Sequence, residues 1–316
     1  MHKEDVAVRT SILILGLLCG AVQAAPFAYV PNEKSGSLSV IDTATDTVVA
    51  TYKAGSRPRG TVVTPGGRIY VSDEPAGALQ VLDAAGGAQI ATIDLGESPE
   101  GVGLSPDGRW VVAAVELSNS VAFIDAQSGK KVASVKTRGK NPEHAVFSPD
   151  ARLLFVSAEE ADSVDVVDVA ARAEVATIKV GNRPRGMGFL PDGSKAYVAC
   201  ELADKVYAID VANLQVAAVI PAGKRANGVA IAPDGKRAYV SNGGDGTVSV
   251  IDTSTDQVVA TIPVGKRPWN MAITPDGRKL YVANGRSNSV SVIETANARV
   301  IGEISVGDLP WGVAIR

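Results

Sequence analysis

Seven segments of this chain carry a charged, amide or aromatic side chain at the same position. In six of them this residue directly follows a proline, and in the seventh it follows Ala226. Three of these segments read Gly-x-Arg-Pro-x-Gly or a near variant, as in residues 55–60. The side chains belong to Arg59, Glu100, Glu143, Arg185, Asn227, Trp269 and Trp311, and the arginines two residues earlier are Arg57, Arg183, Arg225 and Arg267. A guanidinium presents a planar fork to a carboxylate or phosphate, and an indole presents a face to a flat ring. This pattern predicts a binding face for an anionic ligand or a protein partner.

A second set of ionisable side chains follows one short strand in each of five successive segments. It consists of Glu33, Glu74, Glu116, Glu159 and Glu201, and the last two segments have Gly243 and Gly285 instead. Arginine and glutamate around one opening can neutralise each other as exposed ion pairs, each worth about 0–1 kcal/mol. They can also form a functional site, and both interpretations stay open.

Few residues remain for catalysis or metal binding. Outside the first 24 residues, His144 is the single histidine and Cys200 the single cysteine. His144 could act as a general base or simply bond to the backbone, and we expect Cys200 to be a small, partly buried thiol rather than a reactive one. No Cys-x-x-Cys, Gly-x-Ser-x-Gly or phosphate-binding glycine loop occurs. The sequence therefore predicts no catalytic residues, no metal and no cofactor.

The segments that carry these side chains belong to a repeat that spans almost the whole chain. An acidic residue closes one apolar run in each unit, from Asp42 to Glu294, and a turn proline recurs from Pro65 to Pro275, both at steps of 41–43 residues. This period is typical of a four-stranded β-propeller blade. The unit at residues 228–263 shows four short strands: Gly-Val-Ala-Ile, Ala-Tyr-Val-Ser-Asn, Thr-Val-Ser-Val-Ile-Asp and Gln-Val-Val-Ala-Thr-Ile-Pro.

The turns and the chain ends predict how the blades connect and how the ring closes. Ser-Pro-Asp-Gly at residues 105–108 predicts a type I turn between the first two strands of a unit, and Ala151 must make the same turn without the usual glycine. The mature chain begins on a second strand (residues 27–32) and ends on a first strand (residues 312–316), so the two should share one composite blade that removes free edges. We predict an all-β, seven-bladed β-propeller of four-stranded blades, with the side chains above around the mouth of its channel.

The N-terminus is interpreted as a secretory signal peptide, residues 1–24. A polar start precedes the apolar run of residues 12–22, and the chain there suits cleavage after Ala24. Leu18 before Cys19 argues against lipidation. Residues 25–316 then form a single periplasmic or secreted domain, expected to be a monomer, and no further stretch is apolar enough to span a membrane. The net charge of −3 argues against a nucleic acid as the partner.

The repeat resembles the YVTN-type β-propeller repeat over essentially the whole mature chain. The residues that carry the resemblance are Tyr239-Val240-Ser241-Asn242, Tyr281-Val282-Ala283-Asn284, Val250-Ile251-Asp252-Thr253 and Pro275-Asp276-Gly277-Arg278. Within that family, the opening residues 28–36 and the closing residues 309–314 look like periplasmic propellers associated with pyrroloquinoline-quinone-dependent alcohol catabolism. This resemblance implies an accessory role beside a quinoprotein dehydrogenase or its transport system, and it carries over no catalytic residues.

Three functions are compatible with these residues. The first is a non-catalytic periplasmic scaffold or binding protein that holds a protein partner or a small anionic ligand at the mouth. The second is a lactonase-like hydrolase, in which carboxylates of the mouth hold a divalent cation or His144 acts as a base. The third is single-stranded nucleic-acid binding through arginine and tryptophan. The variable mouth on a regular frame and the missing catalytic motifs favour the first, so we predict that the protein is not an enzyme.

Overall fold

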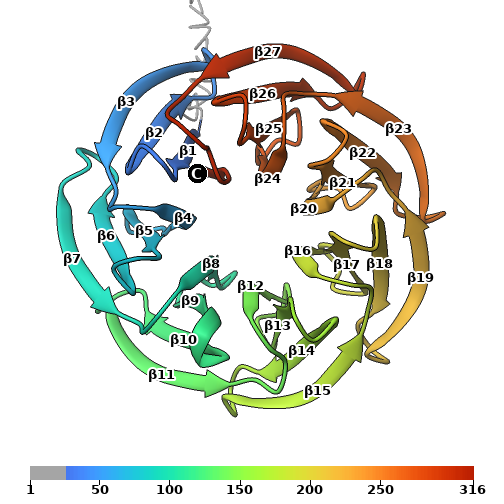
Figure 1. Ribbon diagram of the computed structural model, residues 1–316, viewed down its shortest axis with the longest axis horizontal. Helices are drawn as coiled ribbons and strands as arrows, with labels where there is room; N and C mark the ends of the chain where they lie inside the picture. The colour runs from blue at the N-terminus through green and yellow to red at the C-terminus, as the bar shows by residue number, and fades with distance from the viewer. Residues whose placement is uncertain (1–25) are drawn as a thin grey trace, which may run out of the picture.

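The described part of the chain consists almost entirely of strands. The computed structural model describes residues 26–316, which contain twenty-eight strands and one short 3-10 helix, η1 (Glu116–Ser118). The strands form seven antiparallel four-stranded sheets that stand around a central axis as the blades of a propeller (Figure 1). The predicted fold class is therefore confirmed. The predicted signal peptide lies outside the described residues, and no helix within residues 26–316 is long and apolar enough to cross a membrane.

The strands of each blade follow one another from the axis outward. Blade 1 contains β28 (Ala314–Ile315), β1 (Phe27–Asn32), β2 (Ser37–Asp42) and β3 (Thr47–Lys53). Blade 2 contains β4 (Pro58–Val63), β5 (Arg68–Asp73), β6 (Ala78–Asp83) and β7 (Gln89–Asp94). Blade 3 contains β8 (Pro99–Leu104), β9 (Trp110–Val115), β10 (Ser120–Asp125) and β11 (Lys130–Lys136). Blade 4 contains β12 (Pro142–Phe147), β13 (Leu153–Ala158), β14 (Ser163–Asp168) and β15 (Ala173–Lys179).

The remaining three blades repeat this order. Blade 5 contains β16 (Pro184–Phe189), β17 (Lys195–Cys200), β18 (Lys205–Asp210) and β19 (Gln215–Pro221). Blade 6 contains β20 (Ala226–Ile231), β21 (Arg237–Asn242), β22 (Thr247–Asp252) and β23 (Gln257–Pro263). Blade 7 contains β24 (Pro268–Ile273), β25 (Lys279–Asn284), β26 (Ser289–Glu294) and β27 (Arg299–Ser305).

The first strand of a blade has a bulge directly after its proline position. In β4, Pro58 pairs with Asp73 and Thr61 pairs with Val71, so Arg59 and Gly60 stay outside the ladder. The same shift occurs at the start of β8, β12, β16, β20 and β24. A bulge bends the strand and re-aims a side chain. The residue after the proline position therefore points into the mouth of the channel instead of standing over the sheet.

Neighbouring first strands approach each other closely beside this bulge. The position after the bulged residue is glycine in five blades, namely Gly60, Gly101, Gly186, Gly228 and Gly312. A Cβ atom at Gly60 would lie 2.5 Å from the carbonyl oxygen of Glu100, and one at Gly228 would lie 2.5 Å from that of Trp269. Real Cβ atoms do not approach a backbone atom this closely, so the glycines allow the seven first strands to pack around a narrow axis.

Blade 1, which combines the C-terminal strand with the first three strands of the chain, closes the ring as predicted, except that its C-terminal strand is shorter than expected. In β28, Ala314 pairs with Tyr29 and Ile315 pairs with Ala28, which places the C-terminal strand beside β1 (Figure 1). The predicted strand at residues 312–316 is shortened because the bulge common to first strands removes Trp311 to Val313 from the ladder. Pro310 still bridges to Asn32 on the other side of the bulge.

Apolar clusters lie between neighbouring blades rather than inside single sheets. Tyr70 and Leu79 of blade 2 pack with Val111 and Ala113 of blade 3, for example. Each sheet therefore buries both of its faces against its neighbours, and the blades depend on one another for their cores.

A polar contact accompanies these cores on the face opposite the mouth. Across the ring closure, Lys279 donates hydrogen bonds to Asp46 at 2.7 Å and to the Thr43 carbonyl at 3.0 Å, and the buried Tyr281 hydroxyl also contacts Asp46. Lys195 makes the matching ion pair with Asp256 between blades 5 and 6. The same kind of ion pair therefore joins blades 7 and 1, where the ring closes, and blades 5 and 6.

Ala151 makes its turn in the left-handed backbone conformation that glycine adopts in other blades. Its φ is 58°, a value that glycine adopts at the matching positions Gly108 (φ 70°) and Gly193 (φ 72°). A left-handed backbone costs an alanine about 1–2 kcal/mol, and the repeat tolerates that cost at one turn.

Adding one methyl group between two first strands should destabilise the ring. We expect Gly60→Ala to lower the free energy of unfolding by about 1–3 kcal/mol, because the new Cβ meets backbone that cannot move aside without shifting a strand. Gly302→Ala is the matched control, since a Cβ there meets nothing within 4 Å on the outermost strand of blade 7. Urea unfolding of both variants checks this, and equal midpoints for the two would contradict it.

Candidate functional site

A cavity of about 630 Å³ opens at the mouth of the channel. All seven side chains that follow the proline position line it, together with four of the five glutamates of the second set. The lining residues are Glu33, Arg59, Glu74, Glu100, Glu116, Glu143, Glu159, Arg183, Arg185, Asn227, Arg267, Trp269, Asn270, Arg286, Leu309 and Trp311. The bulges of seven different blades thus bring to one place residues spread over more than two hundred positions of sequence.

Two predicted arginines lie outside this lining, and three lining residues were not predicted. Arg57 contacts Glu33 and Glu74 at the rim, and Arg225 lies 3.5 Å from Glu201. The residues missed are Asn270, Arg286 and Leu309. A signal for Asn270 exists, because it and His144 take the place of the glycine that follows the bulged residue in the other five blades. Leu309 stands two residues before Trp311, the repeat position that Arg183 and Arg267 occupy in their blades, so the register gives a signal for it, whereas Arg286 carries no such sign.

The loops that carry the mouth arginines are held from below by polar residues at the ends of second strands. The buried Asp73 accepts backbone hydrogen bonds from Ser56 at 3.1 Å and from Arg57 at 3.0 Å. Asn242 does the same for Gly223 at 3.1 Å. Cys200 takes this position in blade 5, where burial raises the pKa of its thiol to about 12. The thiol is therefore protonated and fully buried, as expected of an unreactive cysteine.

Two arginines each hold several glutamates of the mouth. Arg59 lies 3.1 Å from Glu33 and also contacts Glu100. Arg185 lies 2.6 Å from Glu143 and 3.0 Å from Glu201, and it reaches Glu159 at 3.1 Å. These ion pairs are mostly buried, unlike the exposed pairs considered from the sequence. Buried charges lose their hydration, so each carboxylate here depends on its partner far more than a surface carboxylate would.

Glu201 is the most heavily paired carboxylate of the site. Its side chain is 1% exposed and lies 2.7 Å from Arg267, 3.0 Å from Arg185 and 3.5 Å from Arg183. Burial alone would raise the pKa of Glu201, but these arginines outweigh it and lower the pKa from the ordinary 4.5. Glu201 therefore stays ionised and joins the loops of blades 5, 6 and 7.

Glu100 and Glu143 are affected by their surroundings in opposite directions. Burial, followed by the negative charge of Glu143, raises the pKa of Glu100 from 4.5 to about 9 in spite of Arg59. Burial would also raise the pKa of Glu143, but Arg185 leads the groups that outweigh it and lower that pKa. Near pH 7 the first carboxyl group is protonated and the second is ionised.

A stack of two rings lies beside the cavity, and one of the rings, that of Trp311, lines it. The rings of His144 and Trp311 lie 5.4 Å apart between centroids and 15° from parallel. Both nitrogens of His144 are buried, and burial lowers the pKa of the imidazole from 6.5, so it is neutral. A smaller cavity of about 130 Å³ lies against this stack. Trp311 lines both cavities, whereas Trp269 lies beside Arg267, 5.8 Å from the guanidinium carbon to the ring centroid.

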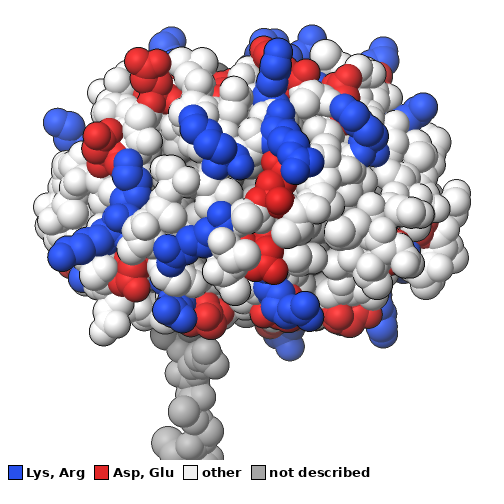
Figure 2. Space-filling view, turned by 90° about the horizontal axis from the view of Figure 1, so that it is seen from below, with Lys and Arg blue, Asp and Glu red and all other residues white. Residues whose placement is uncertain are grey.

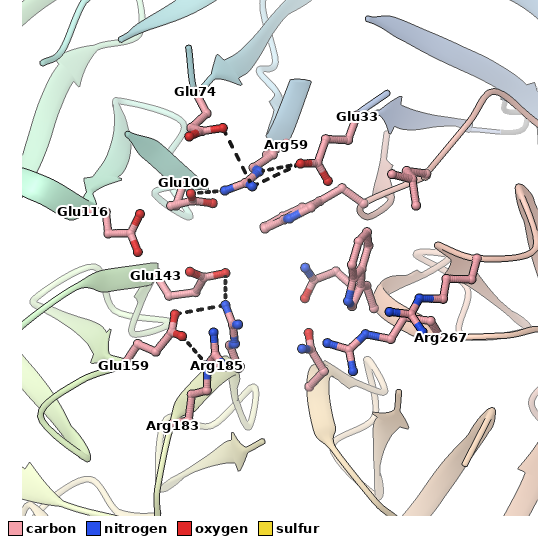
Figure 3. Close-up of a pocket in the computed structure, with 16 residues that line it drawn as sticks. Glu33, Arg59, Glu74, Glu100, Glu116, Glu143, Glu159, Arg183, Arg185 and Arg267 are labelled. Atoms are coloured by element: carbon pink, nitrogen blue, oxygen red, sulfur yellow. Dashed lines mark hydrogen bonds and ion pairs between the residues drawn. The ribbon is translucent and has the colours of Figure 1, made fainter. Parts of the chain in front are cut away.

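The carboxyl groups gather on one part of the mouth, where Arg59 and Arg185 lie among them (Figure 3). Glu74, Glu100 and Glu116 lie together on one side, and Arg267 lies on the opposite side (Figure 3). On the outer side of the ring drawn in Figure 2, by contrast, basic and acidic side chains are interspersed. Among residues 26–316, no three acidic, histidine or cysteine side chains lie close enough together to hold a metal ion.

A family model described as lactonase, 7-bladed β-propeller, matches residues 23–177 and 168–301. The two matches together cover most of the chain. The chain belongs to the seven-bladed lactonase family. The expectation of a non-catalytic scaffold is therefore wrong, as is the expectation that the protein is not an enzyme. Membership of a lactonase family favours the alternative, a lactonase-like hydrolase, which sequence motifs could not indicate because the site has no local signature.

Solved structures of the same fold agree with this assignment to the propeller class. Hydrazine synthase from Kuenenia stuttgartiensis is 25% identical, with a TM-score of 0.79 over 90% of this chain and 99% of that chain. A putative 6-phosphogluconolactonase from Bacteroides uniformis is 21% identical, with a TM-score of 0.78 over 93% of this chain and 100% of the other. The dihydro-haem d1 dehydrogenase NirN, in complex with DHE, is 15% identical, with a TM-score of 0.71 over 93% and 76%. A comparison with curated proteins gave no match.

Removing the charge of Glu201 from this lactonase-family mouth should destabilise it. We expect Glu201→Gln to lower the free energy of unfolding at pH 7 by about 3–5 kcal/mol, because several arginines lose their shared partner. Since the folded pKa of Glu201 is lowered, its stabilisation is present above the unfolded value of 4.5 and is lost as the pH falls through the folded pKa. The difference between the two proteins should therefore shrink in acid.

Chemical unfolding of both proteins between pH 3 and pH 7 provides the measurement. Glu160→Gln is the control, since Glu160 is exposed and makes no ion pair with any described residue. A Glu201→Gln protein as stable as this control at pH 7 would show that the network contributes nothing.

Proposed function

We propose that this member of the lactonase family hydrolyses a cyclic ester that carries a negatively charged group, and that the reaction takes place in the mouth. One observation carries the proposal: a single cavity is lined both by buried carboxyl groups and by Arg286, which makes no ion pair with any residue from 26 to 316. The carboxyl groups suit the activation of water, and the free guanidinium suits an anion on the substrate.

Arg59 and Arg185 can stabilise the negative charge that develops during ester hydrolysis. Attack of water on a lactone carbonyl places negative charge on the carbonyl oxygen. Arg59 and Arg185 are held in fixed positions by their glutamates and face the middle of the mouth (Figure 3). A guanidinium has five N–H donors, so these two retain donors for such an oxygen. Because the ion pairs already fix them, they need little rearrangement when the charge appears.

The opposite side of the mouth provides for recognition of the rest of the substrate. Arg267 and Trp269 lie side by side, with Asn270 and Arg286 also in the lining. A carboxylate or phosphate would bond to the guanidinium of Arg286, and a ring would lie against the Trp269 indole. The name of the Bacteroides uniformis structure makes a phosphorylated sugar lactone the first substrate to test.

We further propose export to the periplasm or beyond, as a monomer. Support comes from the sequence of residues 1–24 and from the resemblance to YVTN-type repeats and to periplasmic propellers associated with pyrroloquinoline-quinone-dependent catabolism. A lactone presented outside the cytoplasm would then be the substrate.

Arg286 should decide the preference for charged lactones. For Arg286→Met we expect the KM for a phosphorylated or carboxylated lactone to rise about tenfold, corresponding to about 1.4 kcal/mol of lost binding. The KM for an uncharged lactone of the same ring size should not change. Initial rates of ring opening, followed by acid release, measure both.

Lys266→Met provides the control, because Lys266 is exposed on a neighbouring loop and does not line the cavity. No ring opening by the unmodified protein with γ- or δ-lactones, charged or uncharged, would refute the proposed function. Equal effects of Arg286→Met on charged and uncharged lactones would refute the role of Arg286.

A further inference from the structure

Glu100 and Glu143 occupy the same position in two neighbouring blades. Each follows the proline at the start of its first strand, β8 or β12, so the bulge turns both side chains into the mouth. They are 1% and 6% exposed, and both line the cavity (Figure 3). No other pair of adjacent blades carries two carboxylic acids at this position.

The two carboxyl groups differ in their partners. Glu100 contacts Arg59 through Oε1, while its Oε2 is buried and has no hydrogen-bonding partner among residues 26–316. Arg59 is shared with Glu33, so it does not balance Glu100 alone. Glu143 lies 2.6 Å from Arg185, a strong charge-assisted contact. One carboxyl group thus has an unused oxygen inside a cavity, and the other is fixed as an anion.

The charges that face the pair come from several elements. Glu100 faces Glu143 from β12, Arg59 from β4, Glu116 from η1 and Glu74 after β5. Glu143 faces Arg185 from β16, Arg59 from β4 and the neighbouring His144. Two buried carboxylates close to each other cannot both ionise easily. The proton remains on Glu100, in line with its raised pKa of about 9, and the charge remains on Glu143, beside Arg185.

We propose that Glu100 and Glu143 act as an acid–base pair that activates water for the ring opening, with Glu143 as the base and Glu100 as the acid. This inference rests on the proposed function. The Glu143 carboxylate takes a proton from water while the water oxygen bonds to the lactone carbonyl carbon. Glu100 then gives its proton to the ring oxygen as the bond between that oxygen and the carbonyl carbon breaks.

Atoms and protons balance over this cycle. The product is a hydroxy acid, the pair still holds one proton, and that proton now lies on Glu143. Its return to Glu100 restores the resting state, and Arg185 favours this return because it favours the anion of Glu143. His144 is less suited to the role of base, since both of its nitrogens are buried and its ring is stacked on Trp311.

The dependence of kcat/KM on pH tests the pair. With the full-length protein and a lactone, we expect rates to rise through a pKa below 4.5 and to fall above a pKa of about 9, because only the singly protonated pair is active. Glu100→Gln should lower kcat about 10²–10³-fold and remove the fall near pH 9. Glu143→Gln should lower kcat similarly and remove the rise in acid. Glu97→Gln, an exposed neighbour outside the cavity, should change neither.

A readout without substrate separates this inference from the proposed function. Side-chain carboxyl NMR of the protein labelled at glutamate, with Glu100→Gln for assignment, should show one carboxyl group that titrates near pH 9. Titration of Glu100 near pH 4.5 would overturn the pair whatever the activity. Loss of rate in both glutamine variants with an unchanged pH profile would also overturn it, since a structural role alone has that effect. Failure of every lactone as a substrate, with Glu100 titrating near pH 9, would refute the hydrolase and leave the shared proton established.

Discussion

The first strands of the seven blades crowd closely around one axis, and at one position in most blades the neighbouring backbone leaves no room for a Cβ atom. At Gly60 such an atom would lie 2.5 Å from the Glu100 carbonyl of the next blade. The bulge before this position turns one side chain of each blade into the mouth. The close packing brings these side chains together and removes most water from around them. Burial of the ion pairs, and hence the chemistry of the mouth, follows from this backbone constraint.

The mouth contains similar numbers of carboxyl groups and arginines, but they do not form one-to-one ion pairs. Arg59 and Arg185 each serve several glutamates, and Glu201 serves several arginines. Buried carboxylates without their own cation retain protons, because ionisation in a poorly hydrated place costs more than in water. Burial and the charge of Glu143 raise the pKa of Glu100, and Arg286, which has no ion pair within residues 26–316, lies in the lining of the same cavity. Membership of the lactonase family gives this separation of charge a chemical interpretation.

On the face opposite the mouth, contacts between neighbouring blades occur at the same position but differ in chemical type. Lys279 pairs with Asp46, and at the same place in blades 3 and 4 the guanidinium of Arg172 lies 5.1 Å from the centre of the Trp110 ring. These contacts differ in chemistry but join the same two elements. The frame needs only that neighbouring blades touch, so it accepts an ion pair or a cation–π contact alike. The mouth depends on which charge faces which, so a change of residue type there changes its chemistry.

The sequence alone determined the fold and which side chains surround the mouth of the channel. A period of 41–43 residues, Pro-Asp-Gly turns and a chain that starts on one strand type and ends on another specify seven closed blades, because these signals are local and repeated. The same register placed Arg59, Glu100, Glu143, Arg185, Asn227, Trp269 and Trp311 around one opening. Only the tertiary structure decided how those side chains pair, that Trp311 stacks on His144, and that one oxygen of Glu100 finds no hydrogen-bonding partner in the described part of the chain. Pairing and burial depend on distances between blades, and no single repeat encodes those distances, so the sequence pattern favoured a scaffold where the family is one of lactonases.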